Sequence, residues 1–153
     1  MSKSFLIDTE SYIIVKCYFV EEKNKEKDHN NEEIEIVNRT YVPSEVIEQI
    51  NLDENQVLRY AIGSFRKPTY RSYCLIKTKS LTIDTVTKTL YTHPTRLQNE
   101  IVNYLLFAIQ DDKGQRTDIT DENKKQYFGE IDPIIIIGLC REFMKKSGIS
   151  FDE

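Results

Sequence analysis

The first third of the chain alternates apolar stretches with stretches that lack apolar residues. Residues 12–20 are mostly β-branched and aromatic, which favours a strand. Residues 34–42 begin with alternating apolar and polar positions and predict a second strand. The segment 21–33 between them has no apolar side chain, so we predict an exposed, mobile loop. Together these segments predict a β-hairpin with a long charged tip.

Helical signals follow the hairpin. Pro43 favours a short helix that runs to about Ile50, because the first helical turn does not need the proline N–H. Asp53 and Gln56 resemble a capping box, and the apolar residues over 57–65 share one helical face, so a helix is predicted there.

The segment 82–92 gives conflicting signals. Its threonines favour a strand, whereas Ile83, Val86 and Leu90 have helical spacing. We give the spacing more weight and predict a helix.

Three further helices are predicted toward the C-terminus, each after a capping residue. They cover residues 96–110 after Thr95, a short segment from Thr120 through Phe128 that Gly129 ends, and residues 133–146 between Asp132 and Gly148. The sequence Asp111–Gly114 predicts a turn.

No internal repeat or linker is visible, so residues 1–153 are expected to form a single α+β domain. Residues 1–42 would form an N-terminal β-hairpin or small antiparallel sheet. Residues 43–153 would form a mostly helical C-terminal part.

Composition narrows the classes of protein. The 153 residues are 39% apolar, enough for one hydrophobic core, and the net charge of −4 disfavours a uniformly basic nucleic-acid binder. Asp8 and Glu10 interrupt the apolar residues that a secretory signal would need. The longest apolar run, 134–137, is far shorter than the roughly 20 residues that cross a bilayer. We therefore expect a soluble protein without a membrane partner.

Signals for chemistry are weak. Cys17, Cys74 and Cys140 are far apart in sequence and are expected to be reduced, buried side chains. His29 and His93 lack the neighbours of an activated nucleophile or a metal site. We predict no catalytic residue, no metal and no cofactor, and hence a protein that is not an enzyme.

A basic segment over residues 66–79 interleaves cations with tyrosines, a pattern that can hold phosphates and stack bases. Its candidate polyanion-binding residues are Arg66, Lys67, Arg71, Lys77 and Lys79. The alternative, favoured by the overall acidity, is a solvated loop whose cations meet the acidic remainder of the protein.

The last predicted helix is apolar around more than half of its circumference, wider than the usual stripe on a surface helix. It is either central to the core or buries a second face against another chain. Its candidate partner-binding residues are Ile134, Ile135, Ile136, Ile137, Phe143 and Met144. We expect at least one of the isoleucines to be exposed in the monomer.

The order of elements over residues 95–147 is similar to that of a known family. An Arg96-x-x-x-Glu100 helix precedes Asp111–Gly114, then Ile119-Thr120-Asp121-Glu122-Asn123, then the apolar helix. This resembles the tail assembly chaperones of tailed bacteriophages.

The resemblance implies a non-enzymatic assembly protein in the cytoplasm of an infected bacterium. Its partner would be another copy of itself or a viral structural protein, such as a tape-measure or tube protein. One alternative is a structural component of the virion, in the neck, baseplate or capsid. Another is a small nucleic-acid-binding regulator that uses residues 66–79.

Overall fold

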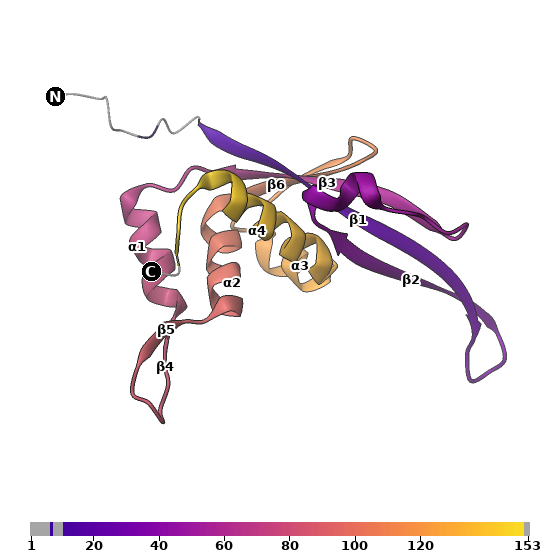
Figure 1. Cartoon of the computed structure of the whole chain (residues 1–153), viewed down its shortest axis with the longest axis horizontal. Coiled ribbons are helices and arrows are strands. Elements are labelled where there is room, and N and C mark those ends of the chain that lie inside the picture. The colour runs from indigo at the N-terminus through magenta and orange to yellow at the C-terminus, as the bar shows by residue number, and fades with distance from the viewer. Residues whose placement is uncertain (1–6, 8–10, 152–153) are drawn as a thin grey trace.

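A five-stranded antiparallel sheet forms the body of the protein, with helices packed on one of its faces (Figure 1). The computed structural model describes residue 7 and residues 11–151. The strand order is β2-β1-β3-β6-β7, with β1 (Tyr12–Lys27), β2 (Glu33–Val42), β3 (Gln56–Arg66), β6 (Leu106–Asp111) and β7 (Arg116–Asp118). A separate hairpin pairs β4 (Leu81–Ile83) with β5 (Leu90–Thr92). The helices are η1 (Ser44–Gln49, a 3₁₀-helix), α1 (Tyr70–Ser80), α2 (Pro94–Leu105), α3 (Lys124–Glu130) and α4 (Pro133–Ser147).

This arrangement contradicts the predicted fold. A sheet confined to residues 1–42 is wrong, since β3, β6 and β7 complete the sheet from later segments, although helices do predominate in the later part of the chain. The last two strands lie between helices in the chain. The protein is therefore an α+β fold in which strands and helices are mixed along the sequence.

The core lies between the sheet and α4. Alternate residues of β1, namely Val15, Cys17 and Phe19, face the helix and are buried, as the two-residue period of a strand requires. Phe65 of β3 stacks on Phe143 of α4 with ring centroids 4.5 Å apart. These contacts place one face of α4 against the middle of the sheet.

Two glycines allow this close packing. A Cβ atom at Gly138 of α4 would lie 2.8 Å from Cδ2 of Tyr41 and 3.1 Å from Sγ of Cys17. A Cβ atom at Gly63 of β3 would lie 2.9 Å from Cδ2 of Leu139. A side chain at either position would push the helix away from the sheet.

The predicted hairpin is confirmed, but the predicted loop over 21–33 is wrong. β1 continues to Lys27 and pairs with β2 from residue 33 onward, so only residues 28–32 form the turn. Asp28 accepts hydrogen bonds from the N–H groups of Asn30 and Glu32, and Asn31 has a left-handed φ of 62°. Residues 21–27 thus extend β1 by cross-strand pairing with β2 although they have no apolar side chain of their own. We call residues 23–37 the arm; it projects beyond the sheet (Figure 1).

The helix predicted over 57–65 is also wrong, because this segment is strand β3. Apolar residues four positions apart fit one face of a helix. Four is also a multiple of the two-residue period of a strand, so the same spacing fits one face of a sheet. Ala61 and Phe65 do share one face of the sheet. The capping-box pair instead closes a turn, in which the N–H of Asp53 donates to Oε1 of Gln56 at 3.0 Å.

Three more helix predictions need correction. Residues 82–92 form the β4–β5 hairpin, in which the strand preference of threonine outweighs helical spacing. Helix α2 is capped by His93 rather than Thr95 and ends at Leu105, after which β6 begins without a loop. Helix α3 starts at Lys124 and runs through Gly129 to Glu130.

The limits of α4 are confirmed. Oδ1 of Asp132 accepts a hydrogen bond from the N–H of Ile134, and Pro133 is the first helical residue. Gly148 ends the helix with a left-handed φ of 68°. The turn at Asp111–Gly114 is likewise confirmed, with Gly114 at a φ of 85°.

Among the described residues, one stretch of β1 has a neighbouring strand on one side only. Residues 12–17 pair with β3, whereas β2 ends at Val42, opposite Tyr18. On the other side, Nζ of Lys146 donates a hydrogen bond of 2.6 Å to the carbonyl oxygen of Ile14. A side chain of α4 thus occupies one backbone acceptor of this edge.

Candidate functional site

The outer face of α4 carries part of the predicted partner-binding set. Ile135 and Phe143 face the sheet and belong to the core. Ile134 is half-buried and packs against this core. Ile136, Ile137 and Met144 are half-buried and line hollows between α4 and its neighbours. Of the run 134–137, Ile135 is buried and the other three isoleucines are half-buried, so the predicted exposure is found only in part.

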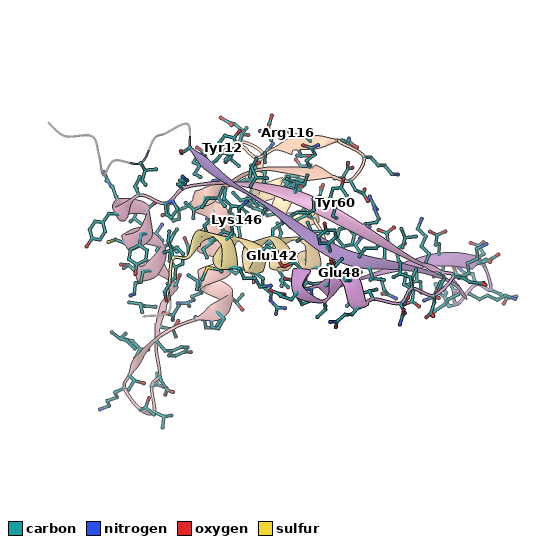
Figure 2. The ribbon with its side chains drawn as sticks, turned by 45° about the horizontal axis from the view of Figure 1, so that its top comes forward. Tyr12, Glu48, Tyr60, Arg116, Glu142 and Lys146 are labelled. Atoms are coloured by element: carbon teal, nitrogen blue, oxygen red, sulfur yellow. The ribbon has the colours of Figure 1, made fainter. Side chains whose placement is uncertain are left out.

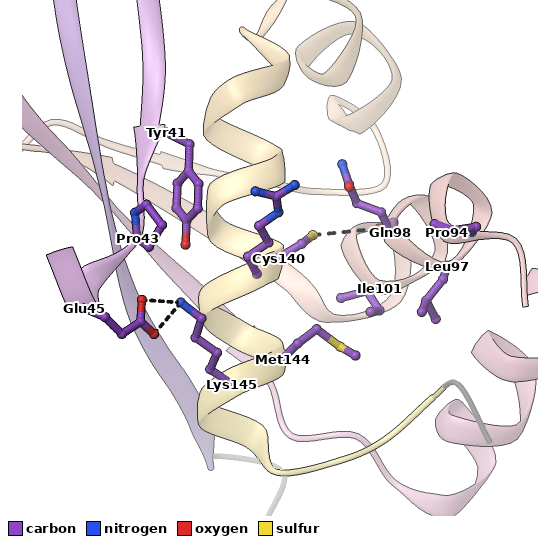
Figure 3. Close-up of a pocket in the computed structure, with 11 residues that line it drawn as sticks. Tyr41, Pro43, Glu45, Pro94, Leu97, Gln98, Ile101, Cys140, Met144 and Lys145 are labelled. Carbon is purple, nitrogen blue, oxygen red and sulfur yellow. Dashed lines mark hydrogen bonds and ion pairs between the residues drawn. The ribbon is translucent and has the colours of Figure 1, made fainter.

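The larger hollow lies between α4, the start of α2 and the end of β2, and we call it groove 1 (Figure 3). Its volume is about 620 Å³. Its walls are mainly apolar and include Tyr41, Pro43, Leu97, Ile101, Cys140 and Met144.

A second hollow, groove 2, lies between α2, α3 and the start of α4 and has a volume of about 370 Å³. Its apolar lining consists of Val102, Phe128, Ile131, Pro133, Ile136 and Ile137. Gln98 of α2 lines both grooves, so they meet along the seam between α2 and α4. The apolar excess of α4 is thus divided between the core and these two grooves.

Charged side chains form the rim of groove 1. The buried carboxylate of Glu142 accepts hydrogen bonds from the O–H of Tyr41 at 2.5 Å and from Nζ of Lys145 at 3.3 Å. Burial and the hydrogen bond to Glu142 raise the pKa of Tyr41 to about 12. Lys145 also pairs with Glu45 at 2.8 Å, and this contact raises the pKa of Lys145 to about 12. The lysine is therefore already paired within the chain.

Arg141 is the cation of this rim that is left available. Its guanidinium lies 5.4 Å from the ring centroid of Tyr41, and no carboxylate of the described residues forms an ion pair with it. Groove 1 therefore combines apolar walls with one cation at its edge.

The cysteines near this site are unreactive. Burial raises the pKa of Cys17 and of Cys140 to about 12, so both thiols stay protonated at neutral pH. Both are buried as predicted, whereas Cys74 is half-buried; all three are free. Cys140 contributes an apolar wall to groove 1 rather than a nucleophile.

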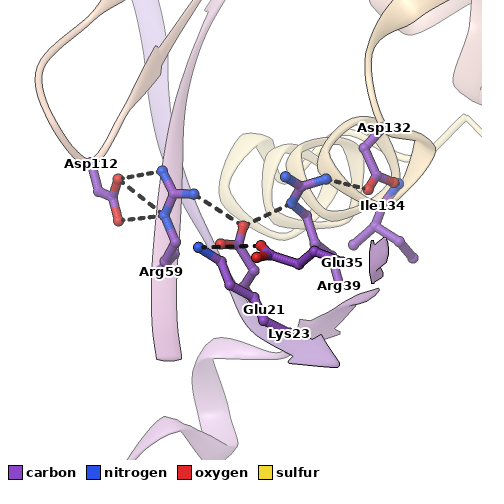
Figure 4. Close-up of polar contacts among 8 residues, drawn as sticks. All are labelled: Glu21, Lys23, Glu35, Arg39, Arg59, Asp112, Asp132 and Ile134. Atoms are coloured by element: carbon purple, nitrogen blue, oxygen red, sulfur yellow. Dashed lines mark hydrogen bonds and ion pairs between the residues drawn. The ribbon is translucent and has the colours of Figure 1, made fainter. Parts of the chain in front are cut away.

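A ladder of ion pairs that was not predicted lies at the start of α4 (Figure 4). Glu21 of β1 receives hydrogen bonds of 3.0 Å from both Arg39 and Arg59. Arg59 also binds both oxygens of Asp112, and Arg39 binds Asp132 at 2.9 Å. Three carboxylates balance two guanidiniums, so the ladder has no spare cation for an anionic ligand.

The ladder positions α4. Asp132 both pairs with Arg39 and caps the helix, so the ladder connects the start of α4 to strands β1, β2 and β3. Burial by itself would raise the pKa of Glu21, but the hydrogen bond from Arg39 and the charge of Arg59 outweigh it and lower that pKa. A signal was present in the sequence, since Glu21 continues the inward-facing odd positions of β1.

The predicted basic segment lies around α1 rather than in a loop. Among the residues that the structure describes, none of its five cations forms an ion pair with a carboxylate. Aromatic contacts are present instead: Arg66 lies 5.2 Å from the ring centroid of Phe107, and Nζ of Lys79 hydrogen-bonds to the hydroxyl of Tyr104 at 2.5 Å. Within the part of the chain that the structure describes, the expected pairing with the acidic remainder is not found.

Two negative findings concern residue 7 and residues 11–151. Within these ranges no group of three or more His, Cys, Asp or Glu side chains could hold a metal ion. No helix among them has the length and apolar character needed to cross a membrane.

Comparisons with known proteins were made at three levels, and each was negative. No protein-family model matches the chain, no curated protein matches it, and no solved structure matches its fold.

Proposed function

We propose that this chain is a non-enzymatic assembly protein that binds an apolar segment of another protein in the grooves along α2 and α4. The observation that carries the proposal is the outer face of α4, where Ile136, Ile137 and Met144 are only half-buried and line apolar grooves. This function is the one that the resemblance to tail assembly chaperones implies.

The chemistry of the grooves indicates what they would bind. Apolar walls favour aliphatic or aromatic side chains, and Arg141 at the rim of groove 1 favours a carboxylate next to them. Burial of a few hundred Å² of apolar surface favours binding by a free energy of roughly 25 cal/mol per Å². The loss of translational and rotational freedom on association opposes binding by about 4–15 kcal/mol. The balance gives transient binding, which suits a chaperone that releases its client.

The test is a substitution in groove 2. Ile137→Lys places a charge in an apolar groove, and we expect it to weaken binding to the tape-measure or tube protein at least about tenfold, or about 1.4 kcal/mol. Leu75→Lys on α1 is the matched control, because Leu75 is an exposed aliphatic residue that lines neither groove.

Binding is measured by calorimetry with the purified client, and circular dichroism verifies that both variants are folded. Equal affinities for Ile137→Lys and the original chain would overturn the proposal.

A structural component of the virion is the second candidate. The observation that favours it is the pair of projecting hairpins, the arm and β4–β5, which could reach neighbouring subunits (Figure 1). Mass spectrometry of purified particles separates the two candidates. A chaperone of the infected cytoplasm is absent from particles, whereas a neck, baseplate or capsid component is present in a fixed copy number.

The nucleic-acid-binding alternative is supported by the cations around α1 and by Tyr70, which is 82% exposed. A regulator of this kind would bind nucleic acid with an association constant whose logarithm falls linearly with the logarithm of the salt concentration. The net charge of −4 weighs against it.

A further inference from the structure

Charged residues are divided unequally between the two ends of the molecule. At one end, residues 23–35 of the arm have five acidic side chains and three lysines. Asp53 and Glu54 add two acids at the base of the arm, because they directly precede Asn55, whose carbonyl accepts a hydrogen bond from the N–H of Lys23. At the other end, residues 66–96 have seven cations and one acid. Figure 1 shows the arm and α1 at opposite ends of the long axis.

Each of these ends also exposes apolar side chains. Ile34 and Val37 of the arm are 41% and 37% exposed. On the β4–β5 hairpin beside α1, Ile83, Val86 and Leu90 are 61%, 89% and 64% exposed. Both ends therefore offer apolar surface next to charge of opposite sign, as complementary protein surfaces do.

We propose that copies of this chain associate head to tail, with the acidic arm of one copy bound to the basic α1 end of the next. The partner is a second copy because both complementary surfaces belong to this chain and lie too far apart to meet within one molecule (Figure 2). Contacts between two arms, or between two α1 ends, would bring like charges together.

Such a contact uses different surfaces on its two sides, so it builds a ring or a filament rather than a closed dimer. The inference goes beyond the proposed function, because it does not involve grooves 1 and 2.

The experiment uses two charge variants of the full chain. Glu26→Lys with Glu32→Lys changes the net charge of residues 23–35 from −2 to +2, and neither carboxylate has an ion-pair partner among the described residues. Lys67→Glu, Arg71→Glu and Lys77→Glu change residues 66–79 from +5 to −1. Lys113→Glu with Lys125→Glu is the control, on exposed lysines away from both ends.

Sedimentation velocity measures the association. We expect the original chain and the control to form oligomers that weaken when the salt concentration rises from about 0.1 to about 1 M, as the Debye length falls from about 10 to about 3 Å. Each charge variant alone should associate at least about tenfold more weakly, and an equimolar mixture of the two should associate more strongly than either variant alone.

A monomeric original chain at low salt would overturn the inference, as would a mixture that associates no better than its components. Labelled single-stranded DNA is a further probe: a monomeric chain that binds it through Lys67 and Arg71 would assign the α1 end to nucleic acid instead. Ile137→Lys is expected to leave self-association unchanged, so failure here and failure of the proposed function are distinguishable.

Discussion

At the scale of single residues, Gly138 decides how closely α4 packs on the sheet. We expect Gly138→Ala to destabilise the protein by about 1–3 kcal/mol, because the added methyl group meets Tyr41 and Cys17 in a filled core. Gly129→Ala in α3 is the control, since a Cβ there meets nothing within 4 Å and alanine favours the helix by up to about 1 kcal/mol. Urea unfolding measures both. A loss of stability in both variants would show that packing at Gly138 is not the cause.

A second residue-scale prediction concerns the pH dependence of stability. The pKa of Glu21 is lowered in the folded protein, so its contribution is present above the unfolded pKa of about 4.3 and is lost as pH falls through the folded value. Glu21→Gln should therefore lower the free energy of unfolding by about 1–3 kcal/mol at neutral pH and flatten its decline below about pH 4. Thermal melts between about pH 3 and 7 provide the comparison. An unchanged slope would mean that other carboxylates dominate acid unfolding.

At the scale of elements, the arm is expected to be dispensable for folding. Replacing residues 25–35 by Asn-Gly joins Asn24 to its partner Ile36 through a two-residue hairpin turn. We expect the melting temperature to change by less than about 4 °C, which corresponds to under 1 kcal/mol, because the removed residues bury no apolar side chain in the core. Calorimetry measures this. A larger loss would show that the arm supports the sheet.

Elements were predictable where local chemistry alone defines them. Asp132, Pro133 and Gly148 fix the ends of α4 by capping, and residues 12–20 are rich in strand-forming side chains. The segments over 57–65 and 106–110 were misread as helices because pairing with distant strands determines them. Ala61 pairs with Asp111 across 50 positions of sequence. No local pattern encodes such pairing.

The candidate site was predictable only where local sequence determines it, and not where it depends on pairing between distant strands. The apolar excess of α4 was visible in the sequence, but which isoleucines face the core depends on where the sheet lies. The inward position of Glu21 could be read from the alternation of β1, but its partners Arg39 and Arg59 could not, because they come from two other strands whose register forms only on folding. The basic segment was identified, whereas its aromatic contacts require the packing of α1 beside α2.

At the scale of the whole molecule, one core cluster joins the sheet and the helices. We expect equilibrium unfolding in urea to be a single two-state transition, coincident by far-ultraviolet circular dichroism and tyrosine fluorescence. Strand pairing between distant segments predicts refolding on the millisecond-to-second scale. Two separate transitions would show that the helices and the sheet unfold independently.

The hydrogen bond from Lys146 to the carbonyl oxygen of Ile14 has a consequence for aggregation of the protein at high concentration. An unpaired strand border is a template on which foreign strands can extend a sheet, and a lysine placed against it is a common safeguard. Neutralising that amine, by acetylation or by Lys146→Met, would leave residues 12–17 open to recruitment. We expect faster growth of thioflavin-positive aggregates for Lys146→Met than for Lys125→Met, with little change in melting temperature. The C-terminal helix would then act as a guard against amyloid-like polymerisation as well as a core element.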